Sequence, residues 1–190
     1  MNCNKKNYTT EDVLAIMTTK KMVHLAMLTS FGLALHILES FIPNPFIGIA
    51  PGAKLGLANI IALITLVLYG FKYAMTVNLM RCFIAGIVSG AISSMIYSMA
   101  GALASTILMF LIYKYFKNLF SLVGVSVFGA LGHNIAQLTV AAVIINNMRI
   151  YTYLPIMVLT SIFTGIFIGL TANFTVEKTI SYFQNSFKII

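Results

Sequence analysis

The chain has 190 residues, of which 59% are hydrophobic and only 8% charged, and its formal net charge is +8. A mean hydropathy of +0.95 excludes a soluble globular domain and indicates an integral membrane protein. Because one membrane crossing needs about 20 apolar residues, this length holds about five or six crossings and little else.

The first 21 residues, MNCNKKNYTTEDVLAIMTTKK, are polar and are predicted to form a tail (residues 1–21) ahead of the first membrane helix. No small-residue cleavage pattern accompanies the apolar run that follows, so we expect no removable signal peptide. Cys3 lies in the tail and Cys82 in an apolar stretch, a distribution that predicts neither a disulfide nor a metal site.

Six apolar segments follow and are predicted to form one helical membrane domain over residues 22–176. The expected helices cover residues 22–42, 55–70, 73–91, 93–113, 119–146 and 151–174. The third and fourth come from one run that is about twice the length of a single crossing. We divide this run at the small-residue cluster between Ser89 and Ser94, which suits a tight reversal. Residues 177–190 are predicted to form a C-terminal tail.

The basic residues support six crossings with both termini in the cytoplasm. Only Lys54 and Arg149 then lie outside, and the positive-inside rule is satisfied by nine cytoplasmic lysines, namely Lys5, Lys6, Lys20, Lys21, Lys72, Lys114, Lys117, Lys178 and Lys188. Five crossings would move the last two lysines outside. The positive charge is thus expected to orient the protein and attract anionic lipid, and we expect no nucleic-acid partner.

The segment that joins the first two helices reads ESFIPNPFIGIAPGAKLGLANI (residues 39–60). Its prolines disfavour continuation of the first helix, and its glycines allow a folded lid over the outer face. Glu39 and Lys54 bracket this predicted lid. We expect their charges to face inward, toward Arg81 and His133.

Polar residues within the apolar segments carry most of the functional information. Arg81 lies near the middle of the third helix, where a charge costs about 2.5–3.5 kcal/mol on insertion scales and usually faces a polar interior. Other helices offer polar groups at overlapping depth, which is what a small-molecule site that opens outward needs. The predicted site consists of Glu39, Lys54, Asn59, Arg81, His133, Asn134 and Gln137.

Most of these residues also have a structural interpretation, and His133 by itself is more often a satisfied core histidine than a ligand contact. The amides of Asn134 and Gln137 could link helices, a common use of amides in membranes. Lys54 could extend to the lipid headgroups, and Glu39 and Arg81 could form a structural ion pair in a scaffold that binds no ligand. Taken together, the structural interpretations are less favoured, because one small protein would have to bury all of these polar groups at the same depth in the membrane.

Small residues recur every fourth position in the first helix, at Ala26, Ser30 and Ala34. At about 100° per residue they form a strip along one face, where another helix can approach closely. His36 and Glu39 fall on the opposite face. The pattern predicts that one face packs against a helix or a partner protein while the other faces the polar cluster; ordinary packing within the bundle is the alternative.

Several of these residues give the chain a resemblance to a known family. The resemblance is carried by Glu39-Ser40, Pro43, Pro45, Gly52, the KLGLAN sequence at 54–59, Arg81, Gly129-Ala130, His133-Asn134 and Gln137. These elements resemble the Gx transporter family, also catalogued as heptaprenyl diphosphate synthase component I and similar to the substrate-binding S components of energy-coupling factor (ECF) transporters. The resemblance spans about residues 22–176, and K-L-G-L-A-N and H-N-x-x-Q are its most specific parts.

The resemblance implies a six-helix S-component fold in a bacterial plasma membrane, with a small-molecule substrate captured from outside. The small-residue strip would dock on a transmembrane coupling protein that two ATPases drive. Arg81 and Lys54 would bind an anionic or strongly accepting group, and His133, Asn134 and Gln137 would add hydrogen bonds. The chain has no Walker A sequence, so it would not hydrolyse ATP itself.

The second family name implies prenyl chain elongation, in which Mg²⁺ held by clustered aspartates ionises a diphosphate. This chain has a single aspartate, Asp12. We therefore expect no catalytic residues, no metal site and no cofactor. The alternative function is a noncatalytic membrane component associated with a heptaprenyl diphosphate synthase subunit in isoprenoid-quinone biosynthesis. The identity of the bound molecule does not follow from the residues.

Overall fold

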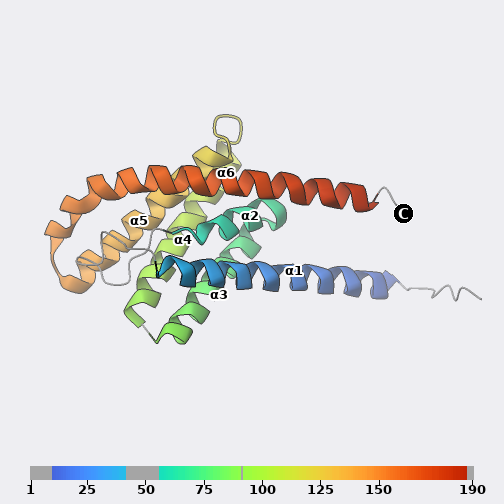
Figure 1. The fold of residues 1–190 in the computed structure, drawn as a ribbon, viewed down its shortest axis with the longest axis horizontal. Helices are drawn as coiled ribbons and strands as arrows, with labels where there is room; N and C mark the ends of the chain where they lie inside the picture. Colours follow the sequence, from blue (N-terminus) through green and yellow to red (C-terminus); the bar gives the residue numbers. More distant parts are fainter. Residues whose placement is uncertain (1–9, 42–55, 91, 188–190) are drawn as a thin grey trace, which may run out of the picture.

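The computed structural model describes residues 10–41, 56–90 and 92–187 (Figure 1). All regular structure in these ranges is helical, which confirms the predicted all-α class. The elements are α1 (Thr10–Glu39), α2 (Asn59–Tyr69), α3 (Phe71–Ser89), α4 (Ile92–Tyr115), α5 (Leu122–Ile145), the 3-10 helix η1 (Met148–Tyr153) and α6 (Leu154–Phe187). Lys54 and most of the predicted lid, residues 42–55, lie outside the described residues.

Five stretches in the described chain are long and apolar enough to cross a membrane, where the sequence predicts six. They are Thr18–Glu39, Phe71–Ser89, Ile92–Tyr115, Leu122–Ile145 and Met148–Ser181. Helix α2 has only 11 residues, which at about 1.5 Å per residue is roughly 16 Å, or half of the hydrocarbon thickness. Helices α1 and α6 continue beyond their apolar parts, so much of both predicted tails is helical.

Helix α2 lies at the centre of the bundle and contacts each of the other five α-helices. Its sequence, NIIALITLVLY, is apolar on all sides apart from Asn59 and Thr65, and its residues 59–66 are all buried. A helix that is apolar all round is stable only when it is enclosed. Its side chains form the main apolar cluster together with Ala74, Val77, Met109, Val125, Ile168, Ala172 and Val176.

A second, smaller apolar cluster lies farther along the bundle and is formed by Tyr97, Leu138, Ala141, Ala142, Ile150 and Met157. Helices α4, α5 and α6 each contribute to both clusters. The stretches between their two contributions carry buried polar side chains, namely Ser98, Ser105 and Thr106 of α4, Ser126, His133, Asn134 and Gln137 of α5, and Ser161 of α6. The bundle therefore contains a buried polar layer between two apolar clusters.

Two glycines with positive φ make the tight turns around α3. Gly70, at φ +87°, is the single residue between α2 and α3, and Gly90, at φ +64°, follows the last residue of α3. Glycine adopts this region without the penalty that a Cβ atom imposes. Helix α3 ends at Ser89 and α4 begins at Ile92, within the cluster where the sequence places the reversal.

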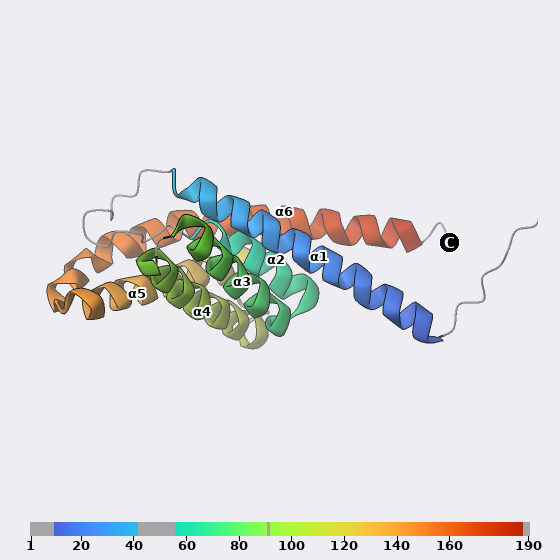
Figure 2. The same ribbon diagram turned by 90° about the horizontal axis from the view of Figure 1, so that it is seen from below.

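The first part of α1 and the last part of α6 project beyond the other helices. Figures 1 and 2 show, in views 90° apart, that both projections lie at the same end of the bundle. The described beginning and end of the chain therefore lie on one side of the molecule.

Helices α5 and α6 pack closely because of two glycines in α6, four residues apart. A Cβ atom on Gly165 would lie 2.5 Å from the Cα atom of Val127, and one on Gly169 would meet the backbone of Val123. The hydroxyl of Ser126 donates a hydrogen bond to the carbonyl of Gly165 across the same contact, at 2.6 Å. This is the small-residue packing that membrane helices use when their backbones approach.

We expect Gly165→Ala to lower the stability of the protein by about 1–3 kcal/mol, because the added methyl group must push α5 and α6 apart. The measurement is the thermal unfolding midpoint of the purified protein in detergent. Phe167→Ala, two residues away on an exposed position of α6, is the control and should change the midpoint little. Equal midpoints for the wild type and Gly165→Ala would contradict the close contact.

Candidate functional site

Arg81 of α3 is the centre of the buried polar layer and is only 2% exposed. Its Nε atom donates to Oδ1 of Asn78 at 2.6 Å, and its Nη2 atom donates to Oδ1 of Asn59 at 3.0 Å. Its Nη1 atom lies 2.9 Å from Nδ1 of His36. Because a guanidinium has donors only, Nδ1 of His36 accepts, and the proton of a neutral His36 is on Nε2. The three hydrogen bonds of Arg81 therefore reach α1, α2 and α3, and all go to uncharged acceptors.

Helix α4 supports this arrangement through Asn78. The side-chain Nδ2 atom of Asn78 donates to Oγ1 of Thr106 at 2.7 Å and to the carbonyl of Ala102 at 3.2 Å. These bonds orient Asn78 so that its Oδ1 atom faces Arg81. On the other side, α1 approaches closely, since a Cβ atom on Gly32 would lie 3.1 Å from Cδ of Arg81. Four helices thus fix the position of the guanidinium.

Helix α5 contributes His133 and Gln137, which are 2% and 0% exposed. Nε2 of His133 and Nε2 of Gln137 are 2.9 Å apart, as the i, i+4 spacing predicts. The ring of His133 lies against two glycines: a Cβ atom on Gly101 would be 2.6 Å from its Cε1 atom, and one on Gly56 would be 3.0 Å from its Cδ2 atom. Two donor-capable atoms here, Nδ1 of His133 and Nδ2 of Asn59, are buried and have no hydrogen-bond partner among the described residues.

Glu39, at the end of α1, is buried and accepts a hydrogen bond from the backbone N–H of Gly56. A Cβ atom on Gly56 would lie 2.9 Å from Nδ2 of Asn59, so this carboxylate is next to the polar layer. Glu39 faces inward, as the sequence predicts. Its bond to Gly56 also ties the end of α1 to the segment just before α2. The hydrogen bonds of Arg81 go to other groups, which does not favour a simple Glu39–Arg81 pair.

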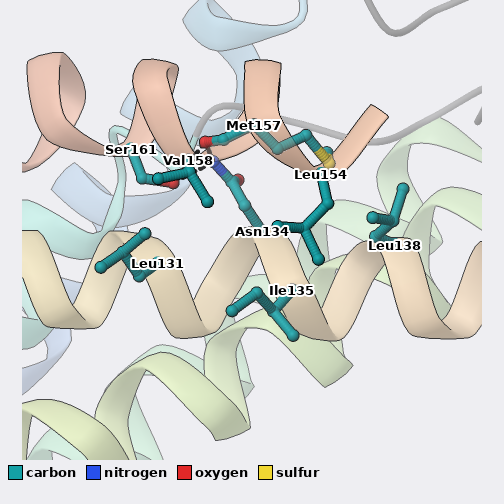
Figure 3. A pocket seen from close by; sticks show the side chains of 8 residues that line it. All are labelled: Leu131, Asn134, Ile135, Leu138, Leu154, Met157, Val158 and Ser161. Carbon is teal, nitrogen blue, oxygen red and sulfur yellow. Dashed lines mark hydrogen bonds between the residues drawn. The ribbon is translucent and has the colours of Figure 1, made fainter. Parts of the chain in front are cut away.

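The side chain of Asn134 points toward Met157 and Ser161 of α6 (Figure 3). Its Nδ2 atom donates to Oγ of Ser161 at 2.8 Å and to the carbonyl of Met157 at 3.4 Å. Leu131 and Leu138 line the same contact between α5 and α6. The arrangement agrees with the structural interpretation of this amide, as a link between two helices.

The structure therefore brings together five of the seven predicted site residues, namely Glu39, Asn59, Arg81, His133 and Gln137. It places Asn134 at the α5–α6 contact, and Lys54 lies outside the described residues. Sequence reasoning did not include His36, Asn78 or Thr106 in the site. The spacing of three residues between Asn78 and Arg81 could have indicated their hydrogen bond. The role of Thr106 depends on how α4 packs against α3.

The two faces of α1 are distributed as the sequence predicts. Ala26, Ser30 and Ala34 are exposed, while His36 and Glu39 are buried. Ala26 and Ser30 line an open groove of about 400 Å³ between α1 and α3. A surface of small side chains is therefore available beside the bundle, on the face opposite the polar layer.

Within the part of the chain that the structure describes, no group of three or more His, Cys, Asp or Glu side chains is placed to hold a metal ion. Cys82 is buried, and its thiol donates a hydrogen bond to the carbonyl of Ser98 at 3.5 Å. The polar layer is thus a collection of hydrogen-bonding groups around one cation.

A profile of the family described as heptaprenyl diphosphate synthase component I matches residues 28–175. No curated protein and no solved structure matches the chain. The matched region is most of the chain and includes every described residue of the cluster around Arg81. The chain therefore belongs to the heptaprenyl diphosphate synthase component I family, which is also the Gx transporter family.

Proposed function

We propose that this protein is the substrate-binding subunit of a membrane uptake system and that it holds a small anionic or polar molecule next to Arg81. The observation that carries the proposal is the environment of this guanidinium. It is buried within a helix of membrane-spanning length, and its three hydrogen bonds all go to neutral groups. A charge at such depth is costly, and residues of this kind commonly mark substrate or ion pathways.

An anionic ligand would improve the electrostatic balance of the cluster. A guanidinium has five N–H groups, and the three contacts of Arg81 leave two of them for a ligand. The unpartnered Nδ1 of His133 and Nδ2 of Asn59 could add directional hydrogen bonds. An unsatisfied buried polar group lowers stability by about 1–3 kcal/mol. A ligand that accepts hydrogen bonds from these groups would recover part of that loss.

The N-terminus of α2 adds to the positive electrostatic potential next to Arg81. A helix N-terminus carries a partial positive charge of roughly half an elementary charge. The first amides of α2 are already bonded, since the N–H of Asn59 donates to Gly56 at 2.9 Å and that of Ile60 to Leu57 at 3.1 Å. The α2 N-terminus therefore favours an anion through its dipole rather than through free donors.

The cluster is closed in the described structure, with Asn59 only 1% exposed. In this proposal a ligand enters where α1 ends and α2 begins, and its entry opens the Glu39–Gly56 hydrogen bond that joins these two ends. We propose that the segment over residues 42–55 acts as the lid and that Lys54 is a second cation for the ligand. In the same proposal both termini are cytoplasmic, the lid faces the outside of a bacterial plasma membrane, and all six helices belong to the membrane domain.

Energy would come from a separate ATP-driven module of the ECF type. The exposed strip of Ala26, Ser30 and Ala34 supports this part of the proposal, because its small side chains would allow a partner helix to approach closely. Reorientation of the bound subunit would then release the molecule inward.

The family name supports a second candidate, a noncatalytic membrane component that binds a prenyl diphosphate synthase subunit. The single aspartate of the chain, Asp12, leaves no aspartate cluster to hold Mg²⁺, so catalysis would belong to that partner. Both candidates place the protein in the bilayer and differ in what it binds.

The first test asks whether the gently purified protein retains a small molecule in native mass spectrometry. We expect Arg81→Gln to lower its affinity by roughly 10- to 100-fold, because one charge-assisted hydrogen bond contributes about 1.5–3 kcal/mol. Arg149→Gln removes the same charge from an exposed position and should leave occupancy unchanged.

Arg81→Lys separates binding from folding in this test. Lysine keeps the charge and loses the planar fork, so we expect an intermediate affinity. Thermal unfolding in detergent shows whether each variant is folded. Wild-type ligand occupancy in a folded Arg81→Gln variant would contradict the assignment of Arg81 to the site.

The second test concerns the partner. Ala34→Leu places a branched side chain on the small-residue strip and should abolish co-purification with an ATP-driven coupling protein while ligand occupancy stays at the wild-type level. Ser93→Leu, at an exposed position of α4, is the control and should have no effect. Co-purification of a prenyl diphosphate synthase subunit, with no coupling protein, would favour the second candidate.

A further inference from the structure

A hollow of about 520 Å³ lies between α1, α2 and α6, on the side of the bundle where the ends of α1 and α6 project (Figure 1). We call it the α1–α6 cleft. Its inner wall is apolar and includes Leu28, Phe31 and Ile64, whereas His24, Tyr69 and Lys178 line its other end. On α1 and α2 the polar residue lies nearer the projecting end of the bundle than the apolar ones, and α6 contributes only polar residues, Thr175, Lys178 and Thr179. The cleft is therefore amphipathic along its length.

The polar end of the cleft is positively charged. Nδ1 of His24 lies 3.0 Å from the hydroxyl of Tyr69, and Nζ of Lys21 lies 3.8 Å from the ring centroid of Tyr73 and 5.8 Å from that of Tyr69. Lys178 is exposed at the cleft. The neighbouring Glu177 already accepts a hydrogen bond from Nδ2 of Asn173, at 2.8 Å. The cations at this end thus favour a negatively charged occupant.

We propose that the α1–α6 cleft is a specific binding site for a membrane phospholipid with an anionic headgroup. An acyl chain occupies the apolar wall beside Phe31 and Ile64, and the phosphate lies near Lys178, His24 and Tyr69. Basic pockets between membrane helices bind anionic lipid headgroups in this way. The lysines predict that this end faces the cytoplasm, where the leaflet carries anionic lipid. The site is separate from the cluster around Arg81 and does not depend on the proposed uptake function.

Helix α2 connects this site to the rest of the molecule. Ile64, Leu68 and Tyr69, in its second half, line the cleft, and the side chain of its first residue, Asn59, accepts a hydrogen bond from Arg81. A lipid that binds the folded protein stabilises it by mass action. Anionic lipid should therefore raise the thermal unfolding midpoint more than a zwitterionic lipid with the same chains.

The test titrates the full-length protein in mild detergent with phosphatidylglycerol or phosphatidylcholine of identical acyl chains and follows binding by native mass spectrometry. We expect one phosphatidylglycerol to bind more tightly than phosphatidylcholine. Lys178→Gln should lower the phosphatidylglycerol affinity about fivefold and leave phosphatidylcholine unchanged. Lys117→Gln is the control, because Lys117 lies over the ring of Tyr113, away from the cleft, and should have no effect.

A second variant tests the apolar part. Met27→Trp adds bulk to the wall of the cleft and should weaken both lipids alike, with folding checked by the unfolding midpoint. Equal affinities for the two lipids, or equal effects of Lys178→Gln and Lys117→Gln, would overturn the proposal. Recovery of a polypeptide or a free fatty acid in the cleft, in place of phospholipid, would overturn it as well.

Discussion

The hydrogen-bonding requirement of one buried guanidinium organises this bundle. Arg81 lies at a depth where water cannot solvate it, so protein groups must supply its acceptors. They come from three helices, as His36, Asn59 and Asn78, and Asn78 is in turn held by Thr106 of a fourth. Each acceptor is a short side chain that reaches the guanidinium only if its helix is in register. The polar network therefore constrains the relative positions of α1, α2, α3 and α4.

Helix α2 connects this polar network to the main apolar cluster. This helix starts at the polar layer, where Asn59 meets Arg81, and continues through the main apolar cluster to Tyr69. It contacts every other α-helix, so its position depends on the packing of the whole bundle. Its apolar surface would be unstable outside the bundle.

The two faces of α1 have different surroundings. His36 and Glu39 face the interior and bond groups next to the start of α2, whereas Ser30 and Ala34 lie on the exposed face. A ligand that moves the end of α1 would also shift the exposed strip, because both belong to one continuous helix.

Sequence alone determined the features that depend on composition and local spacing. Hydrophobicity fixed the membrane class, helical periodicity separated the two faces of α1, and the small-residue cluster located the turn at Gly90. Tertiary packing decided the rest. His133 and Asn134 are adjacent, yet they diverge by about 100° around α5, so one joins Gln137 and the other meets α6. The identity of the helix that packs against each face of α5 is set by long-range contacts. So is the short length of α2, since neither feature leaves a local pattern in the sequence.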